Sequence, residues 1–344
     1  HCRIPGRKSK HLNFEEVKDA VNAFYEQGGR CLYLQGGEPF LWRAADCGID
    51  DIVAYAHSIG FFAVIIYTNG TFPLQTSADT VFVSVDGLQE TIDGRLREVN
   101  RQLSTWIQDS EISRFNRFGT VGEKFPISDD FLRVMTAAAE VHRLSGGAWD
   151  GTVSPLVVLW GFGPGGPALS APSPDRIAAA RAEVGFDKIE IRPPGALVKR
   201  DAAVTVDLSS IAKGYGVDAV AGLLREEGFS DYLVEIGGEV FGAGRRRDGR
   251  PWRVGINRPD PGAGPGEVYK VVPLGDQALA TSGDYRSYVL EDGRRRSHVI
   301  DPRTGEPVTN RVISASVLAP SCMLADGLAT AVMVMGPKLS LIHI

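Results

Sequence analysis

Apolar residues in the first 90 positions alternate between helical spacing and short continuous runs. Helical spacing covers 14–27 and about 50–59, and the apolar runs lie at 30–34, 61–67 and 80–85. Runs of this length that end in turn residues are typical of buried strands. Because these strands alternate with helices, the pattern predicts parallel βα units in this part of the chain.

The pattern changes at about residue 90. Apolar residues between Ile92 and Leu103 predict an amphipathic helix, and another helix is predicted over 129–144. Beyond residue 185 the predicted elements are mostly strands, at 188–191, 196–199, 203–206, 232–236, 252–256, 269–272, 287–290, 297–300 and 313–318. Helices that are segregated from hairpin-linked strands predict an α+β fold for this half.

The segment 207–218 is predicted to begin a helix. It follows the strand predicted over 203–206, and the apolar residues after it recur at helical spacing as far as Gly228. Its first residues therefore lie at a strand-to-helix junction, where free N–H groups and the helix dipole favour anions. The polar residues at this junction are Asp207, Ser209, Ser210 and Lys213. Ordinary helix capping by Asp and Ser is the alternative interpretation.

Composition and charge exclude some classes of partner. The 344 residues allow about two domains, and 43% hydrophobic and 23% charged residues are ordinary values for a globular protein. A net charge of −5 argues against a nucleic-acid partner. The arginine runs 245–247 and 294–296 lie beside Asp-Gly turns and are expected at solvated hairpin tips. No window is apolar enough to predict a transmembrane span.

Two further segments carry candidate chemistry. Asp326 and Thr330 are four residues apart, so a helix would place both side chains on one face, where their oxygen atoms suit Mg²⁺. A helix N-cap carboxylate beside an unrelated threonine is the alternative. His298 opens the segment 298–305, and its imidazole is a candidate general base for a hydroxyl nucleophile. The same segment also fits a plain hairpin corner with an Asp-Pro turn.

Ordered segments over about 91–337 resemble the ApbE family of FAD:protein FMN transferases, also described as flavin-trafficking proteins. These segments are 104–106, 110–116, 150–156, 159–163, 207–215, 235–238, 280–285, 298–305 and 325–330. The resemblance implies an ApbE-like (T-fold-type) mixed α/β transferase domain. It implies Mg²⁺-dependent transfer of FMN from FAD to a threonine hydroxyl of an acceptor protein, with release of AMP. It also implies a periplasmic location or the outer face of the inner membrane, although no export signal is recognised in this sequence.

The resemblance further implies roles for individual residues. His298 matches the family's proposed catalytic base. Mg²⁺ would be held by Asp326 and Thr330 and by the region of Ser210, through a backbone oxygen. The residues expected to contact FAD are Trp106, Ala148, Trp149, Asp150, Asp207, Lys213 and Ile300. The rings of Trp106 and Trp149 offer flat faces for a flavin or adenine, although large aromatic side chains more often belong to a core. A flavin-binding carrier without turnover and an inactive chimeric product are the alternatives.

Residues 1–87 resemble part of a radical-SAM domain. The resemblance rests on Gly36-Gly-Glu-Pro39 and on Cys2, which matches the last cysteine of that family's C-x-x-x-C-x-x-C loop. It implies a partial βα-barrel fragment. One cysteine cannot hold a 4Fe–4S cluster, so we expect no intact iron–sulfur cluster and no radical chemistry. A strand-ending turn is the alternative interpretation of 36–39.

The ends of the ApbE-like segment depart from the family pattern. The strand with Met-Gly-Thr that normally opens the family is replaced by 1–87, and the expected final helix and strand are replaced by 338–344. Residues 339–344 match the translated transposon end used to tag sequencing libraries. We therefore expect a chimera with an incomplete fragment at 1–87, a transferase domain at 91–337 and a non-native tail at 338–344. Missing edge strands would lower its stability.

Overall fold

The computed structural model describes residues 12–34, 42, 44, 46–61, 63–68, 78, 80–83, 86–163, 171–260, 262–263, 267–284, 288–291 and 294–340. The chain divides into two compact units, 1–93 and 94–344, which are described separately. Cys2, the segment 36–39 and residues 341–344 lie outside the described residues. Within the described part, no helix is both long and apolar enough to cross a lipid bilayer.

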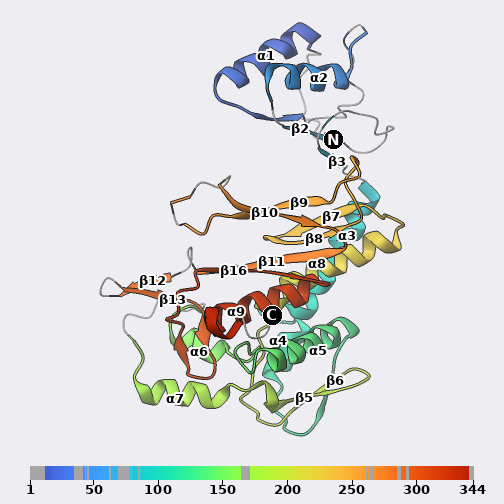
Figure 1. The fold of residues 1–344 in the computed structure, drawn as a ribbon. Coiled ribbons are helices and arrows are strands. Elements are labelled where there is room, and N and C mark those ends of the chain that lie inside the picture. The colour runs from blue at the N-terminus through green and yellow to red at the C-terminus, as the bar shows by residue number, and fades with distance from the viewer. Residues whose placement is uncertain are drawn as a thin grey trace, which may run out of the picture. The chain divides into compact units, whose positions relative to one another are not determined.

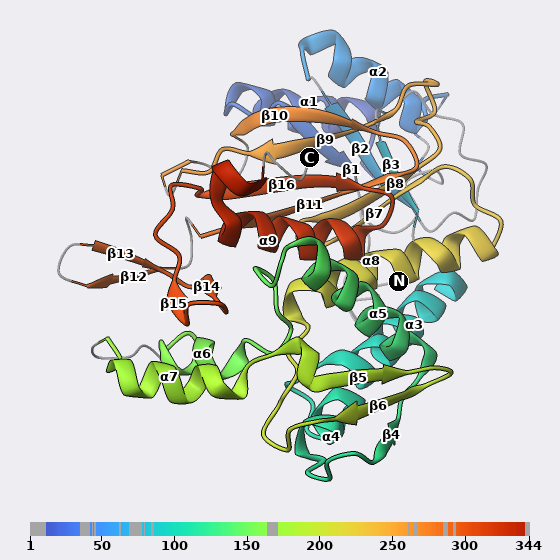
Figure 2. The same cartoon turned by 60° about the horizontal axis from the view of Figure 1, so that its bottom comes forward.

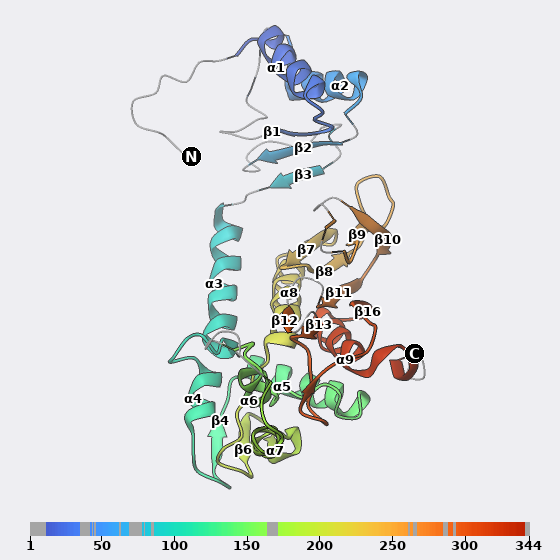
Figure 3. The ribbon, with the colours of Figure 1, turned by 90° about the vertical axis from the view of Figure 1, so that its left-hand side faces the viewer.

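The first unit is a small parallel βα structure. Its strands pair in the order β1-β2-β3, and both of its helices lie on one side of this sheet (Figure 3). The elements are α1 (Phe14–Glu26), β1 (Cys31–Leu34), α2 (Ile49–Ile59), β2 (Ala63–Thr68) and β3 (Thr80–Val83). Val53 and Ala56 of α2 pack with Val64 of β2 in its core. The predicted parallel βα units are confirmed, but the described residues show no barrel.

Helix α3 (Asp86–Leu103) crosses the boundary between the units, and the second unit begins with its C-terminal half. A three-stranded antiparallel sheet in the order β4-β6-β5 follows, together with α4 and α5 (Figure 2). These elements are α4 (Glu111–Arg117), β4 (Lys124–Pro126), α5 (Asp129–Leu144), β5 (Ile189–Arg192) and β6 (Ala196–Lys199). Phe115, Phe131 and Trp149 lie in the main hydrophobic core.

The centre of the second unit is an antiparallel sheet in the order β16-β11-β8-β7. Helices α8 and α9 cover one face, and the hairpin β9–β10 lies over the other (Figure 1). The elements are α8 (Ser209–Glu226), β7 (Tyr232–Ile236), β8 (Glu239–Ala243), β9 (Trp252–Asn257), β10 (Val268–Leu274), β11 (Gln277–Gly283), β16 (Ser314–Ala319) and α9 (Cys322–Ser340). Because side chains alternate along a strand, neighbouring residues of β8 and β11 face opposite sides of this sheet.

The remaining elements are short, and some of them form a smaller core in which Trp160 is buried with Leu156 and Ile300. They are α6 (Ser154–Leu159), α7 (Pro174–Glu183), the 3₁₀ turn Phe186–Lys188, β12 (Tyr288–Glu291), β13 (Arg294–Ser297), β14 (Ile300–Asp301) and β15 (Glu306–Pro307). The guanidinium of Arg296 lies 5.3 Å from the centroid of the Trp160 ring, and Arg296 is only 8% exposed. The expectation of a solvated hairpin tip is therefore wrong for Arg296. Arg245 is exposed as expected, but it lies in the connection between β8 and β9, which do not pair with each other.

Two predicted strands differ from the structure. Residues 203–206 form no strand, because the side chain of Asn116 replaces a partner strand: its Oδ1 accepts from Val206 N–H at 2.7 Å and its Nδ2 donates to Val206 O at 2.8 Å. The predicted strand 297–300 is interrupted, since β13 ends at Ser297 and β14 begins at Ile300. His298 therefore lies in the short connection between them.

Candidate functional site

The N-terminus of α8 is held beside the loop 148–151. Asp207 N–H donates to Gly151 O at 2.7 Å, and the Asp207 carboxylate accepts from Ser209 N–H at 2.9 Å. Trp149 Nε1 donates to Ser210 Oγ at 2.9 Å. Three of the predicted site residues, Trp149, Asp207 and Ser210, thus take part in hydrogen bonds around the first turn of α8. Their predicted neighbours Ala148 and Asp150 lie in the same loop.

The polar groups of the loop 148–151 are hydrogen-bonded to neighbouring parts of the protein. The Asp150 carboxylate accepts hydrogen bonds from the Thr152 N–H and hydroxyl and from Phe186 N–H, at 2.6–3.1 Å. Trp149 is only 2% exposed and packs in the main core. Its ring is therefore not open to a flavin, contrary to the expectation from its size, and a contact with FAD would have to come from the backbone of this loop.

Helices α8 and α9 meet at Gly214. The Asp326 carboxylate accepts from Gly214 N–H at 3.0 Å, and Asp326 is 3% exposed. A Cβ at Gly214 would lie 2.4 Å from Cys322 O, so only glycine allows this approach. Because Lys213 directly precedes Gly214, the mid-chain lysine turn and the late carboxylate lie at one place. This proximity is what a shared site would require, and the roles of Lys213 and Asp326 in such a site stay predictions.

Asp326 is not a helix cap, which removes the structural alternative for this residue. Asp218 of α8 holds the start of α9, because its carboxylate accepts from Cys322 N–H at 2.7 Å and from Met323 N–H at 2.8 Å. Asp326 lies one turn further along α9. Thr330 follows on the same face, and its hydroxyl lies 3.0 Å from Ser282 Oγ of β11.

Burial is the main influence on the Asp326 carboxyl. It raises the pKa of Asp326 to about 6, against the opposing effect of the nearby Lys213 ammonium, while the negative charge of Glu239 adds to the increase. Lys213 itself is half exposed, and its Nζ lies 2.8 Å from Oε1 of Glu239, which is 2% exposed. The site therefore combines a buried carboxylate pair with one ammonium group.

The donor set at Asp326 fits a hard cation. The described residues contain no group of three or more His, Cys, Asp or Glu side chains that could hold a metal ion, so hydroxyl or backbone oxygen atoms would have to complete a site here. Oxygen atoms from one carboxylate and neighbouring hydroxyls suit Mg²⁺, which usually keeps several waters and binds substrate phosphates. Asp326, Thr330 and the nearby first turn of α8 match that requirement.

Three predicted site residues lie in other segments. His298 contacts Phe162 edge to face, with 6.3 Å between ring centroids. Ile300 is buried in β14. Trp106 is 82% exposed in the turn after α3. Their approach to the group around Asp326 stays a prediction.

The sequence pattern did not identify Gly214, Glu239 and Ser282 as site residues. Glu239 could have been noticed in the sequence, because it is a charged residue directly after the pair Gly237-Gly238. In the structure these glycines form the β7–β8 turn, with φ values of +63° and +101°. As the first residue of β8, Glu239 has its side chain on the face of the sheet that α8 and α9 cover. Gly214 gave no signal by itself, because its role depends on the approach of α9.

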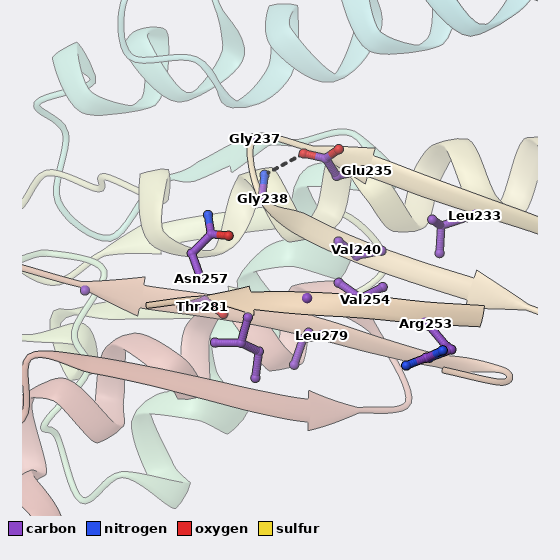
Figure 4. A pocket seen from close by; sticks show the side chains of 13 residues that line it. Leu233, Glu235, Gly237, Gly238, Val240, Arg253, Val254, Asn257, Leu279 and Thr281 are labelled. Carbon is purple, nitrogen blue, oxygen red and sulfur yellow. Dashed lines mark hydrogen bonds between the residues drawn. The ribbon is translucent and has the colours of Figure 1, made fainter. Parts of the chain in front are cut away.

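A separate pocket of about 550 Å³ lies on the opposite face of the central sheet, under the hairpin β9–β10 (Figure 4). In it the Glu235 carboxylate accepts from Gly238 N–H at 3.2 Å. Other lining residues are Leu233, Val240, Arg253, Asn257 and Thr281. No residue expected to bind FAD or metal lines this pocket, so it is distinct from the group around Asp326.

Comparisons with known proteins agree with the motif pattern. The model of the ApbE family matches residues 66–343. An FAD:protein FMN transferase of Vibrio cholerae is 49% identical over 251 residues, which are 73% of this chain and 74% of that protein. The Haemophilus influenzae transferase is 43% identical over 250 residues, 72% of each chain.

Solved structures of the family agree as well. The flavin transferase ApbE from Vibrio cholerae matches with a TM-score of 0.68 and 46% identity, over 75% of this chain and 81% of that one. The apo form of the Pseudomonas stutzeri flavinyl transferase ApbE matches with a TM-score of 0.67 and 39% identity, over 75% and 79%. None of these matches supports the radical-SAM resemblance or a chimeric origin, which stay predictions. The chain therefore belongs to the ApbE family.

Proposed function

We propose that this chain transfers FMN from FAD to an acceptor protein. The observation that carries the proposal is the hydrogen bond from Gly214 N–H to Asp326, which joins a buried carboxylate to the lysine turn at the start of α8. Cleavage of a diphosphate requires that its negative charge be neutralised and that the attacking hydroxyl oxygen of the acceptor be held in line with the bond that breaks. Both requirements are met by positioning and electrostatics. The transferases of Vibrio cholerae and Haemophilus influenzae bear the corresponding names.

The finer chemistry assigns a task to each residue. Asp326, Thr330 and a backbone oxygen near Ser210 would hold Mg²⁺, which when bound supplies positive charge to the diphosphate of FAD. The Lys213 ammonium and the N-terminus of α8 add positive potential at the same place. His298 would take the proton from a threonine hydroxyl of the acceptor, and AMP would be the leaving product.

The remaining contacts would orient the dinucleotide. Backbone groups of 148–150, the side chain of Asp207, and the surfaces of Trp106 and Ile300 are assigned to FAD. The acceptor is a protein with a threonine-containing motif, and we place the reaction in the periplasm or at the outer face of the inner membrane, by resemblance to the family. The alternative is a carrier that binds FAD without turnover.

The variant Asp326→Ala tests this proposal. It is expected to abolish Mg²⁺-dependent release of AMP from FAD and transfer of FMN to a threonine-containing peptide, measured by chromatography and mass spectrometry. Glu235→Gln is the matched control, because this carboxylate lies on the other face of the same sheet. Wild-type turnover in Asp326→Ala would show that the metal site is misplaced. Binding of FAD by the wild type without AMP release would identify a carrier instead.

A further inference from the structure

Glu239 is a buried charged residue to which the mechanism above gives no role. It is 2% exposed at the start of β8, directly after the turn formed by Gly237 and Gly238. Its Oε1 lies 2.8 Å from Lys213 Nζ, whereas its Oε2 is buried and accepts no hydrogen bond from the described residues. A buried carboxylate oxygen without a hydrogen-bond donor destabilises the folded protein, so a donor from outside the described residues is expected at this atom.

The alternation along β8 places Glu239 on the same side of the sheet as Asp326. Val240, the next residue, packs toward the hairpin β9–β10, so Glu239 faces the helices. The backbone confirms this proximity, because Val240 O lies 3.8 Å from the Sγ of Cys322, one helical turn before Asp326. The negative charge of Glu239 is also close enough to contribute to the raised pKa of Asp326.

The turn before Glu239 lies against Oε2. A Cβ at Gly237 would lie 3.6 Å from Glu239 Oε2 and 3.9 Å from Cδ of Lys213, so a side chain there would lie against both groups. The positive φ of Gly237, +63°, also favours glycine. The free oxygen is therefore covered by backbone alone on this side.

We propose that Glu239 is a positioning residue of the flavin-transfer site: Oε1 fixes the Lys213 ammonium, and Oε2 accepts a hydrogen bond from a water on the Mg²⁺ held at Asp326. Metal-bound water can only donate, and Mg²⁺ keeps several waters. Such a water would donate a hydrogen bond to the buried Oε2 of Glu239, and this oxygen would then have the partner that it lacks among the described residues. This inference rests on the proposed function and adds a residue that orients the metal hydrate.

The variant Glu239→Gln separates this role from a structural one. Its amide oxygen still accepts from Lys213, but an NH₂ group replaces the free acceptor and would oppose a donating water. We expect Mg²⁺ affinity of the FAD-bound protein, measured by calorimetry, to fall by about 10-fold or more, the usual effect of losing an outer partner of a metal site. FAD affinity without metal, measured by flavin fluorescence, is expected to be unchanged or higher, since a negative charge is removed.

Three results would overturn the inference. The first is Mg²⁺ affinity within about twofold of the wild type in Glu239→Gln. The second is a parallel loss of metal-free FAD affinity, which indicates general disruption. The third comes from the Lys213→Met background: if Glu239→Gln then has no further effect on Mg²⁺ affinity, Glu239 acts through Lys213 alone.

The control is again Glu235→Gln, which changes a carboxylate of the same hairpin on the opposite face and is expected to leave Mg²⁺ affinity unchanged. A wild type that binds neither FAD nor Mg²⁺ would contradict the proposed function. An active wild type with a normal Glu239→Gln variant would contradict only the inference.

Discussion

The Asp326 carboxyl is placed where a proton and a cation compete. Burial raises its pKa from 3.8 to about 6, so in the metal-free fold the protonated form predominates below about pH 6. Because the pKa is higher in the folded than in the unfolded chain, stability of the metal-free protein is expected to decrease as pH rises from about 4 to 6. A bound cation offsets this loss, because it favours the ionised form.

Metal affinity is therefore expected to depend on pH below about 6, the pKa of Asp326. Each unit of decrease in pH below that value should weaken apparent Mg²⁺ affinity by about tenfold, since the proton must first leave. Calorimetric titration of the FAD-bound protein at pH 7.5, 6 and 5 (chosen to span the transition) measures this effect. An unchanged dissociation constant over this range would show that Asp326 is not a metal ligand.

At the scale of the elements, the position of Asp326 depends on the close contact between α8 and α9 at Gly214. Any side chain here would meet the backbone of Cys322 and Met323, which cannot move aside as a flexible side chain would. Gly214→Ala is expected to lower the free energy of unfolding by about 2–3 kcal/mol and to weaken Mg²⁺ binding, because Asp326 would be displaced. Chemical denaturation and calorimetry measure the two effects.

Gly222→Ala on the same helix is the matched control. A Cβ at Gly222 would meet no atom within 4 Å, and alanine favours a helix by about 1 kcal/mol over glycine. This variant should therefore be slightly more stable than the wild type. Equal stability of both alanine variants would contradict the packing described at Gly214.

The same elements show what the sequence pattern predicts and what it does not. Helical spacing predicted α1, α2, α5 and α8 because each has an apolar face that covers a core. Strand β11 was missed, since most of its residues from Ala278 to Gly283 are small, with Thr281 as the single β-branched side chain and no aromatic residue among them. The contact between Gly214 and Asp326 joins residues 112 positions apart, so it follows from tertiary packing and not from local spacing.

The motifs compensated for that limit. Asp326, Lys213 and Thr330 were placed in one site by their order along the chain, and the structure brings the first two together and sets Thr330 against Ser282. The role of Asn116 as a substitute strand partner was not predictable, because β propensity alone describes residues 203–206. Side chains that take over backbone hydrogen bonds leave no mark in the pattern of apolar residues.

At the scale of the molecule, all residues assigned to the site lie in the second unit, 94–344. A chain that lacks residues 1–85 is therefore expected to keep FAD binding and Mg²⁺-dependent AMP release, because its main core remains complete. Fluorescence titration and AMP analysis measure this. A chain that lacks only 1–65 is the control, since the family model begins at residue 66. Activity of this longer chain but not of the shorter one would assign a functional role to 66–85.

The central sheet also has a consequence for how such a chain changes over generations. Consecutive side chains of its strands face opposite sides: Glu239 faces the helices, and Val240 faces the hairpin β9–β10. Substitutions at every second position therefore reach only one of two environments. A substitution that faces the β9–β10 hairpin can therefore change that surface during evolution without replacing any side chain that faces the helices.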